Sequence, residues 1–232
     1  MKAEVINLDR SPERWAFAEA QAARLGVDLV RVTAVDGRAL ADADHVELCP
    51  PDPRGRRLSK SELACCLSHV AAWRAIVASG ARFGAVFEDD IQLADDAADF
   101  LGADDWVPTD ADIVKLNASR RRAKLSLRAS AAANGRALRR LISPTTDSAG
   151  YVISAAHAER LLAQPRRFTR PLDRALFDTA TGARIHQLVP GLCVQQKFSA
   201  EVFLPETGKG STIQTSRPRD TASSASSSTS SR

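Results

Sequence analysis

Three carboxylates follow one another directly after an apolar segment of the chain. Residues 83–87 read Phe-Gly-Ala-Val-Phe, and Glu88, Asp89 and Asp90 come next. Side chains alternate along a strand, so a strand here is predicted to turn Glu88 and Asp90 to one side and Asp89 to the other. Open α/β sheets bind ligands beyond the carboxyl ends of their strands, where paired carboxylates can hold a hard divalent cation that bridges to substrate phosphates.

The pattern therefore predicts a metal site at Glu88 and Asp90. Such a cation would neutralise the charge that develops on a departing nucleoside diphosphate. The alternative is a solvated acidic turn that binds nothing. Three adjacent acids repel one another unless a counter-charge is present, which favours the metal site.

A second candidate site joins the first apolar segment, residues 3–8, to a predicted helix. Arg10 and Arg14 are four residues apart at the start of that helix, where free backbone N–H groups attract anions. Both arginines could therefore reach a diphosphate group. The alternative is a surface arginine pair beside Asp9 and Glu13.

A predicted helix over residues 59–80 carries two further candidates. Ser59 and Glu62 fit a capping box at its start, so the simplest role of Glu62 is that of capping partner. His69 lies next to the apolar seam of this helix, where a lone histidine is more often a hydrogen-bonded structural residue than a catalyst. Spacing alone leaves a direct role in chemistry open for both residues.

Short apolar segments alternate with helical patterns along most of the chain. Strands are predicted at residues 3–8, 28–35, 82–87, 112–116, 149–153 and 185–189, and helices at 12–25, 59–80, 154–162 and 171–178. The first helix is expected to begin with Ser11 as cap and Pro12 at its first position, and to end at Gly26. This alternation predicts an α/β sandwich with a mostly parallel central sheet. Residues 41–58 are predicted to form a loop, and the pattern does not decide between helix and loop over residues 119–142.

The composition indicates one globular domain followed by a tail. The chain has 232 residues, of which 44% are apolar and 26% charged, as in ordinary soluble domains. One domain is predicted over residues 1–206, whereas the Ser/Thr/Arg-rich residues 207–232 cannot bury enough apolar surface to order themselves. No signal peptide or membrane-spanning run is recognisable, so a cytoplasmic location with free cysteine thiols is expected.

The net charge of +4 includes basic clusters at residues 54–57, 120–124 and 136–140. Such clusters could meet nucleic acid, anionic lipid or a phosphorylated substrate. Binding of single-stranded nucleic acid usually needs aromatic side chains among the basic ones, and the one tyrosine and three tryptophans lie elsewhere. Nucleic acid is therefore not expected as a partner.

Taken together and in order, these segments resemble glycosyltransferase family 25, which includes lipopolysaccharide and lipooligosaccharide galactosyltransferases and collagen galactosyltransferases. The matching segments are residues 6–14 (INLDRSPER), 34–37 (AVDG), 61–69 (SELACCLSH) with Trp73, 87–90 (FEDD), 149–154 (AGYVIS), 171–173 (PLD), and Pro190 with Gln195. The resemblance spans roughly residues 3–215, and its specificity comes from the order of the motifs.

The resemblance implies a GT-A-like fold, a nucleotide-binding α/β sandwich that uses an acidic motif and usually Mn²⁺. Glu88 and Asp90 would then bind Mn²⁺ or Mg²⁺, and the nucleotide side would be lined by Asn7, Leu8, Arg10, Arg14, Asp36 and Asp89. The donor would be a UDP-sugar, commonly UDP-galactose, and the hexose would be transferred with inversion. The acceptor would be a saccharide or lipid-linked saccharide, and the protein would contact the inner membrane peripherally. An inverting reaction needs a general base, for which Asp173 is the first candidate, followed by Glu62 or His69.

The sequence departs from the family pattern at two positions of the predicted helix. Ser61 and Ala64 stand where the family often carries glycine, which changes how closely the backbone can approach a donor. One alternative function is a non-catalytic sugar-nucleotide or glycan-binding module on the same fold. Another is a basic nucleic-acid binder, although no recognition motif of that class is present.

Overall fold

The computed structural model describes residues 1–118 and 122–198. Its strands are β1 (Lys2–Asn7), β2 (Leu29–Thr33), β3 (Phe83–Glu88), β4 (Ile91–Leu93), β5 (Ile113–Lys115), β6 (Leu125–Ala131), β7 (Ala137–Leu141), β8 (Gly150–Ser154), β9 (Ile185–Val189) and β10 (Cys193–Gln195). Its α-helices are α1 (Pro12–Leu25), α2 (Asp42–Leu48), α3 (Lys60–Ala78), α4 (Ala97–Leu101), α5 (Ala155–Leu162) and α6 (Leu172–Leu176), and short 3-10 turns lie at η1 (Ala133–Gly135) and η2 (Thr179–Thr181).

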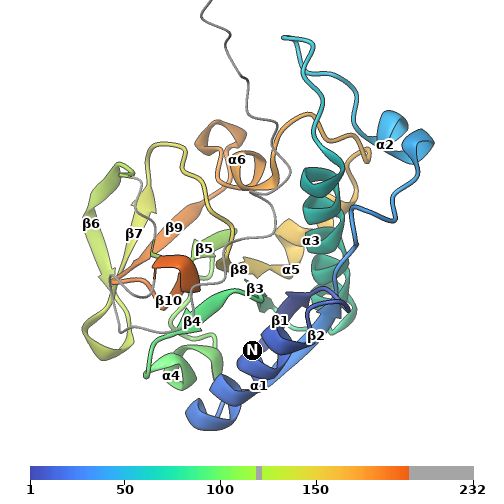
Figure 1. Cartoon of the computed structure of the whole chain (residues 1–232). Helices are drawn as coiled ribbons and strands as arrows, with labels where there is room; N and C mark the ends of the chain where they lie inside the picture. The colour runs from blue at the N-terminus through green and yellow to red at the C-terminus, as the bar shows by residue number, and fades with distance from the viewer. Residues whose placement is uncertain (119–121, 199–232) are drawn as a thin grey trace, which may run out of the picture.

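An eight-stranded mixed sheet forms the centre of the molecule, in the order β2-β1-β3-β8-β5-β9-β7-β6 (Figure 1). The pairs β1–β2, β1–β3 and β5–β9 are parallel, and the other four neighbouring pairs are antiparallel. The prediction of a mostly parallel sheet is therefore wrong. Apolar periodicity marks a strand but not its direction, and β8 runs against both of its neighbours, β3 and β5.

The segment that the sequence left undecided forms a β-hairpin, which is neither helix nor loop. Strands β6 and β7 pair in antiparallel register, and the turn between them holds Asn134 and Gly135 at φ values of 53° and 72°. Asn-Gly adopts this left-handed backbone at low cost, and the dipeptide is a strong hairpin signal. Residues 119–121 of the segment lie outside the described part of the chain.

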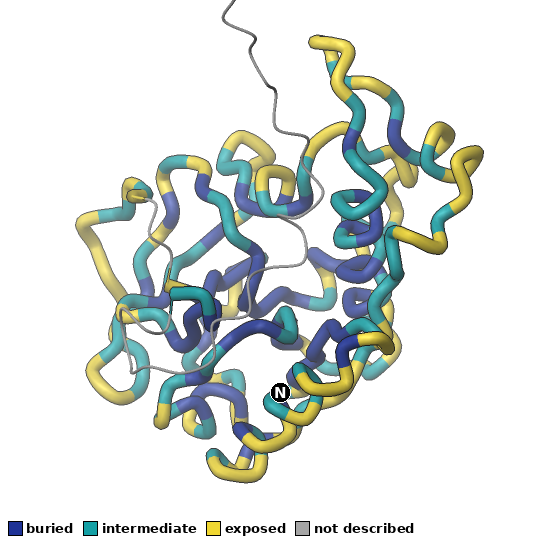
Figure 2. Tube along the Cα trace, viewed as in Figure 1, coloured by how far each residue is buried: buried dark blue, intermediate teal, exposed yellow. Residues whose placement is uncertain are grey.

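Two apolar layers cover the sheet, one on each face. Along β3, Phe83, Ala85 and Phe87 pack into a cluster that includes α1 and α4, whereas Val86 joins a cluster with α3, α5 and α6. The alternation follows from the pleat of the strand. Figure 1 shows these helices on opposite sides of β1 and β3, and Figure 2 shows the central strands β1, β3 and β8 in the buried interior, whereas β6 at the edge of the sheet is largely exposed. The predicted α/β sandwich is confirmed.

Local helix signals hold with two corrections. α1 begins at Pro12 and ends at the left-handed Gly26, as predicted, but the Ser11 side chain makes no capping hydrogen bond. Its carbonyl oxygen instead accepts from Asn7 Nδ2 at 3.0 Å. The predicted loop over residues 41–58 contains a short helix, α2.

The four cysteines are free thiols, as expected. Within residues 1–118 and 122–198, no helix has both the length and the apolar character needed to cross a bilayer. The predicted tail, residues 207–232, lies outside the described residues.

Candidate functional site

A cavity of about 350 Å³ opens where the carboxyl ends of β1 and β3 face the first half of α3. Parallel strands place their carboxyl ends at one edge of a sheet, which explains why residues far apart in sequence meet there. The predicted residues that line it are Leu8, Arg10, Arg14, Asp36, His69, Glu88, Asp89 and Asp90. Asn7, Glu62 and Asp173 are not part of its wall.

Asp89 is held by side chains from the end of β1 and from α1. Arg14 Nη1 donates to Asp89 Oδ1 at 2.9 Å, and Asn7 Nδ2 donates to Asp89 Oδ2 at 2.7 Å. Burial raises the pKa of Asp89, and Arg14 opposes that shift. Both side chains of the Arg14–Asp89 pair are only 11% exposed, and both line the cavity. This buried contact fixes α1 against the end of β3.

The arginine that precedes α1 pairs with a different carboxylate. Arg10 Nε donates to Asp36 Oδ2 at 2.8 Å, and the backbone N–H of Arg38 donates to Asp36 Oδ1 at 2.9 Å. Hydrogen bonds from Arg38 and then Arg10 lower the pKa of Asp36 to about 2. Asp9, one of the two acids considered as alternative partners, pairs with Arg31.

Glu88 and Asp89 lie on opposite sides of β3, as strand alternation predicts. Glu88 Oε1 lies 3.9 Å from His69 Nε2 on α3, whereas Asp89 contacts α1 through Arg14. β3 ends at Glu88, so Asp90 lies in the turn to β4. There Gln195 Nε2, on β10, lies 3.4 Å from both oxygens of Asp90.

Glu88 and Asp90 differ in ionisation. Burial opposes the ionisation of Glu88, but His69 and the hydroxyl of Ser148, which donates to Glu88 Oε1 at 3.1 Å, hold the pKa of this carboxyl below its ordinary value. Asp90 is 3% exposed, and burial together with the charge of Glu88 raises its pKa to about 7. Two neighbouring carboxyls with pKa values pushed apart are typical of functional sites.

These two carboxyls fit a hard divalent cation. Both residues line the cavity and offer carboxylate oxygens, which is the ligand type that Mn²⁺ and Mg²⁺ prefer. The side-chain hydrogen bonds that Asp90 accepts come from the neutral amide of Gln195. A cation would supply the positive charge that this amide lacks.

His69 is a buried polar residue of α3 that lines the cavity, and it is 1% exposed. Its Nδ1 lies 2.8 Å from the hydroxyl of Tyr151, which also accepts a hydrogen bond from Trp73 Nε1 at 2.7 Å. Its Nε2 has no hydrogen-bond partner among the described residues and faces Glu88. The contact with Tyr151 therefore fixes the imidazole ring through Nδ1, and Nε2 is directed at Glu88 at the end of β3.

Glu62 and Asp173 have other contacts. Glu62 completes the capping box: Ser59 N donates to its Oε2 at 2.9 Å, and Glu62 N donates to Ser59 Oγ at 3.2 Å. Asp173 Oδ2 accepts from the backbone N–H of Asp147 at 3.0 Å. The capping interpretation of Glu62 is confirmed, and Asp173 positions the loop that leads to β8.

Two residues near this site were not predicted from the sequence to be functional. Lys115, at the end of β5, is 1% exposed and donates to Asn117 Oδ1 and to the carbonyl of Asp147; burial lowers its pKa to about 8. Its signal was a charge inside an apolar segment. Cys65 lines the cavity, and its four-residue spacing from His69 was the available signal.

Comparison with known proteins adds evidence that is independent of the geometry. The sequence model of the family described as "Glycosyltransferase family 25 (LPS biosynthesis protein)" matches residues 1–176. This match includes β1, α3 and the acidic end of β3, and therefore all the residues described above as lining the cavity.

Several individual proteins are similar to this chain. The "Lacto-N-neotetraose biosynthesis glycosyltransferase LgtB" of Neisseria gonorrhoeae is 30% identical over 229 residues, which covers 94% of this chain and 82% of that protein. The "Lipooligosaccharide biosynthesis protein lic2B" of Haemophilus influenzae is 28% identical over 160 residues, 65% of this chain and 60% of that protein. The "Probable inactive glycosyltransferase 25 family member 3" of Rattus norvegicus is 40% identical over 98 residues, 39% of this chain and 17% of that protein.

Proposed function

This chain belongs to glycosyltransferase family 25, and on that premise we propose that it transfers galactose from UDP-galactose, with inversion, to a saccharide of bacterial surface lipooligosaccharide. The observation that carries the proposal is the meeting of Glu88, Asp89 and Asp90 with two arginines of the β1–α1 region in one cavity. The names of the bacterial relatives, which refer to lacto-N-neotetraose and lipooligosaccharide biosynthesis, support the acceptor class.

Cationic and anionic side chains both line the cavity, as a nucleoside diphosphate and its counter-ion require. Arg10, Arg38 and Lys60 line it with side chains that are 39%, 69% and 34% exposed. These partly exposed cations can turn toward phosphate oxygens. Glu88 and Asp90 would hold a Mn²⁺ or Mg²⁺ ion, which would supply Lewis-acid stabilisation of the departing diphosphate.

The proposal includes a GT-A-like nucleotide-binding half. Its support is the parallel group β2-β1-β3, with α1 connecting β1 to β2 and α3 connecting β2 to β3. Gly37 lies against the start of α3, where a Cβ atom would come within 2.9 Å of the Lys60 carbonyl oxygen. The loop that carries Asp36 therefore packs closely on α3 and forms one wall of the cavity.

His69 is the favoured general base among the three candidates. The acceptor hydroxyl attacks the anomeric carbon as the sugar–phosphate bond breaks, and a base must take the hydroxyl proton. His69 lines the cavity, and its Nε2 has no hydrogen-bond partner within residues 1–118 and 122–198, whereas Glu62 caps α3 and Asp173 binds the Asp147 backbone. The Tyr151 hydroxyl orients the imidazole ring for this role.

The acceptor is proposed to be a saccharide, free or lipid-linked, reached at the cytoplasmic face of the inner membrane. The β6–β7 hairpin supports this placement, since Leu127 is 97% exposed and Ile142, just past β7, is 58% exposed. Arg128 and Arg140 are also exposed on the hairpin. Apolar and basic side chains together are typical of surfaces that meet anionic lipid.

The test is a UDP-release assay with UDP-galactose, Mn²⁺ and a panel of saccharide acceptors. Asp90→Asn is expected to lower turnover at least ~100-fold, because even residues behind a metal ligand contribute 10–100-fold. Asp95→Asn is the matched control, since the Asp95 side chain is 90% exposed, and it should keep full turnover. Equal turnover in the two variants would remove Asp90 from the mechanism.

A second candidate function is a non-catalytic sugar-nucleotide or glycan-binding module. The observation that favours it is the 40% identity to a relative whose printed name calls it probably inactive, although that match covers only 39% of this chain. Calorimetry separates the two functions. A module would bind UDP-galactose without releasing UDP in the presence of any acceptor of the panel.

A further inference from the structure

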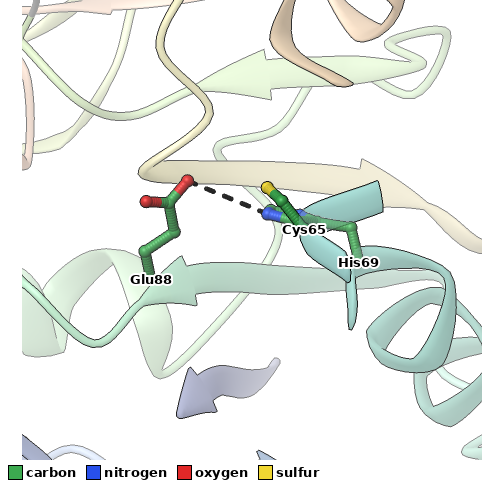
Figure 3. A group of neighbouring side chains, drawn as sticks. All are labelled: Cys65, His69 and Glu88. Atoms are coloured by element: carbon green, nitrogen blue, oxygen red, sulfur yellow. Dashed lines mark ion pairs between the residues drawn. The ribbon is translucent and has the colours of Figure 1, made fainter. Parts of the chain in front are cut away.

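We propose that Cys65, His69 and Glu88 form a site for a thiophilic divalent cation of the Zn²⁺ type, which shares Glu88 with the proposed oxygen site of Glu88 and Asp90. Cys65 and His69 lie one helical turn apart on α3, and Glu88 ends β3. Figure 3 shows the cysteine sulfur beside the imidazole ring and the carboxylate facing both. One sulfur, one nitrogen and one oxygen atom of the three side chains all lie within 4.8 Å of one another.

The second observation is the unpaired nitrogen of His69. Its Nε2 is buried, lacks a hydrogen-bond partner among the described residues, and lies 3.9 Å from Glu88 Oε1. The opposite nitrogen is anchored by the Tyr151 hydroxyl, and metal-binding histidines are commonly fixed in this way. A buried nitrogen without a partner is unfavourable, and a cation would accept its lone pair.

The donor set indicates the class of ion. Thiolate, imidazole and carboxylate together are ligands of Zn²⁺, whereas Mn²⁺ and Mg²⁺ prefer oxygen alone. Zn–ligand bonds of about 2.0–2.3 Å in tetrahedral geometry place donor atoms roughly 3.3–3.8 Å apart. Side-chain movements of about 1 Å would close the present separations to that range. All three residues line the cavity, so a fourth coordination position is open to it.

One consequence rests on the proposed function. Glu88 cannot serve both sites at once, so an ion held with Cys65 and His69 would withdraw it from the oxygen site. Zn²⁺ is therefore expected to inhibit Mn²⁺-dependent UDP release in the wild type. In Cys65→Ala the inhibition by Zn²⁺, measured against the release by the same variant in Mn²⁺ alone, should weaken at least ~10-fold, since one of three ligands is removed.

The binding itself is tested without any activity, by titrating the full chain with Co²⁺. A thiolate-to-Co²⁺ absorption band is expected in the wild type and should be absent in Cys65→Ala. Cys66→Ala is the matched control: the neighbouring thiol is 0% exposed in the core cluster of α3, and its removal should leave the band. A wild type without the band, or a band that survives in Cys65→Ala, would overturn the site.

A measurement on the wild type alone tests the site even where the Cys65→Ala variant fails to fold. Zn²⁺ should slow the alkylation of Cys65 at least ~10-fold, as measured by mass spectrometry of the peptide, whereas an unchanged rate would refute the site. The two proposals fail separately. A Cys65-dependent Co²⁺ band without UDP release would overturn only the transferase, and UDP release without the band would overturn only this site.

Discussion

Asp90 is a buried carboxyl beside a second carboxyl, and this placement makes its negative charge costly. Its pKa is raised to about 7 by burial and then by Glu88, whereas in the unfolded chain it would be near 3.9. A raised carboxyl pKa means that the folded state binds more protons between these two values. The stability from this group is therefore fully present below about pH 4 and is lost as pH rises through about 7.

Asp90→Asn is accordingly expected to stabilise the cation-free protein at pH 8 and to change its stability little at pH 4. A gain of at least ~1 kcal/mol at pH 8 would raise the Tm by about 2–4 °C for a chain of this size. Thermal unfolding at both pH values measures it, with Asp95→Asn as control. A Tm difference that does not depend on pH would contradict the assigned position of the Asp90 charge.

At the scale of single residues, the sequence predicted several residues that line the cavity but not which of them pair. The acidic motif and the arginines of the β1–α1 segment were identified from residue type and spacing. Their pairing was not, because Arg14 and Asp89 are 75 positions apart and their contact depends on β1 and β3 being neighbours. Gln195, which contacts Asp90 from β10, was matched only through the family resemblance.

At the scale of secondary-structure elements, α3 carries both a structural and a chemical role on one helix. Its first turn is closed by Ser59 and Glu62, and its second and third turns present Cys65 and His69 to the cavity. The helix start was predictable because a capping box is a local signal. The cavity-facing side was not, since it depends on where β3 ends.

Ser59→Ala is expected to destabilise the protein by about 1 kcal/mol through loss of the helix cap. Glu62→Gln should keep the hydrogen bond to the Ser59 backbone N–H, and with it both the stability and the rate of UDP release. Urea unfolding and the UDP-release assay measure the two effects. A folded Glu62→Gln protein with no turnover would return Glu62 to the list of catalytic residues.

The β6–β7 hairpin makes the proposed membrane contact testable. Leu127→Glu is expected to weaken binding to anionic vesicles at least ~10-fold, because burying a leucine side chain contributes about 1.5–3 kcal/mol. Val46→Glu on α2 is the matched control: Val46 is 57% exposed, and Figure 1 shows α2 on the other side of the molecule from β6. Vesicle sedimentation at two salt concentrations measures both, and an equal loss in the two variants would refute the hairpin as the contact surface.

At the scale of the whole molecule, the sandwich and most element positions followed from the sequence, but strand direction did not. Short apolar segments located β1, β3, β5, β8 and β9 to within two residues at each end. Direction and pairing depend on contacts between distant segments, and periodicity carries no information on those. The mixed sheet confines the parallel strands β2, β1 and β3 to one end, and the cavity lies at their carboxyl edge.

The central claim is that Glu88 and Asp90 hold a divalent cation that binds the donor diphosphate. Electron paramagnetic resonance of free Mn²⁺, titrated with the protein in the presence and absence of UDP, tests it most directly. The wild type and Asp95→Asn are expected to bind Mn²⁺ more tightly when UDP is present, and Asp90→Asn should lose this UDP-dependent gain. Undiminished UDP-dependent Mn²⁺ binding by Asp90→Asn would contradict the account.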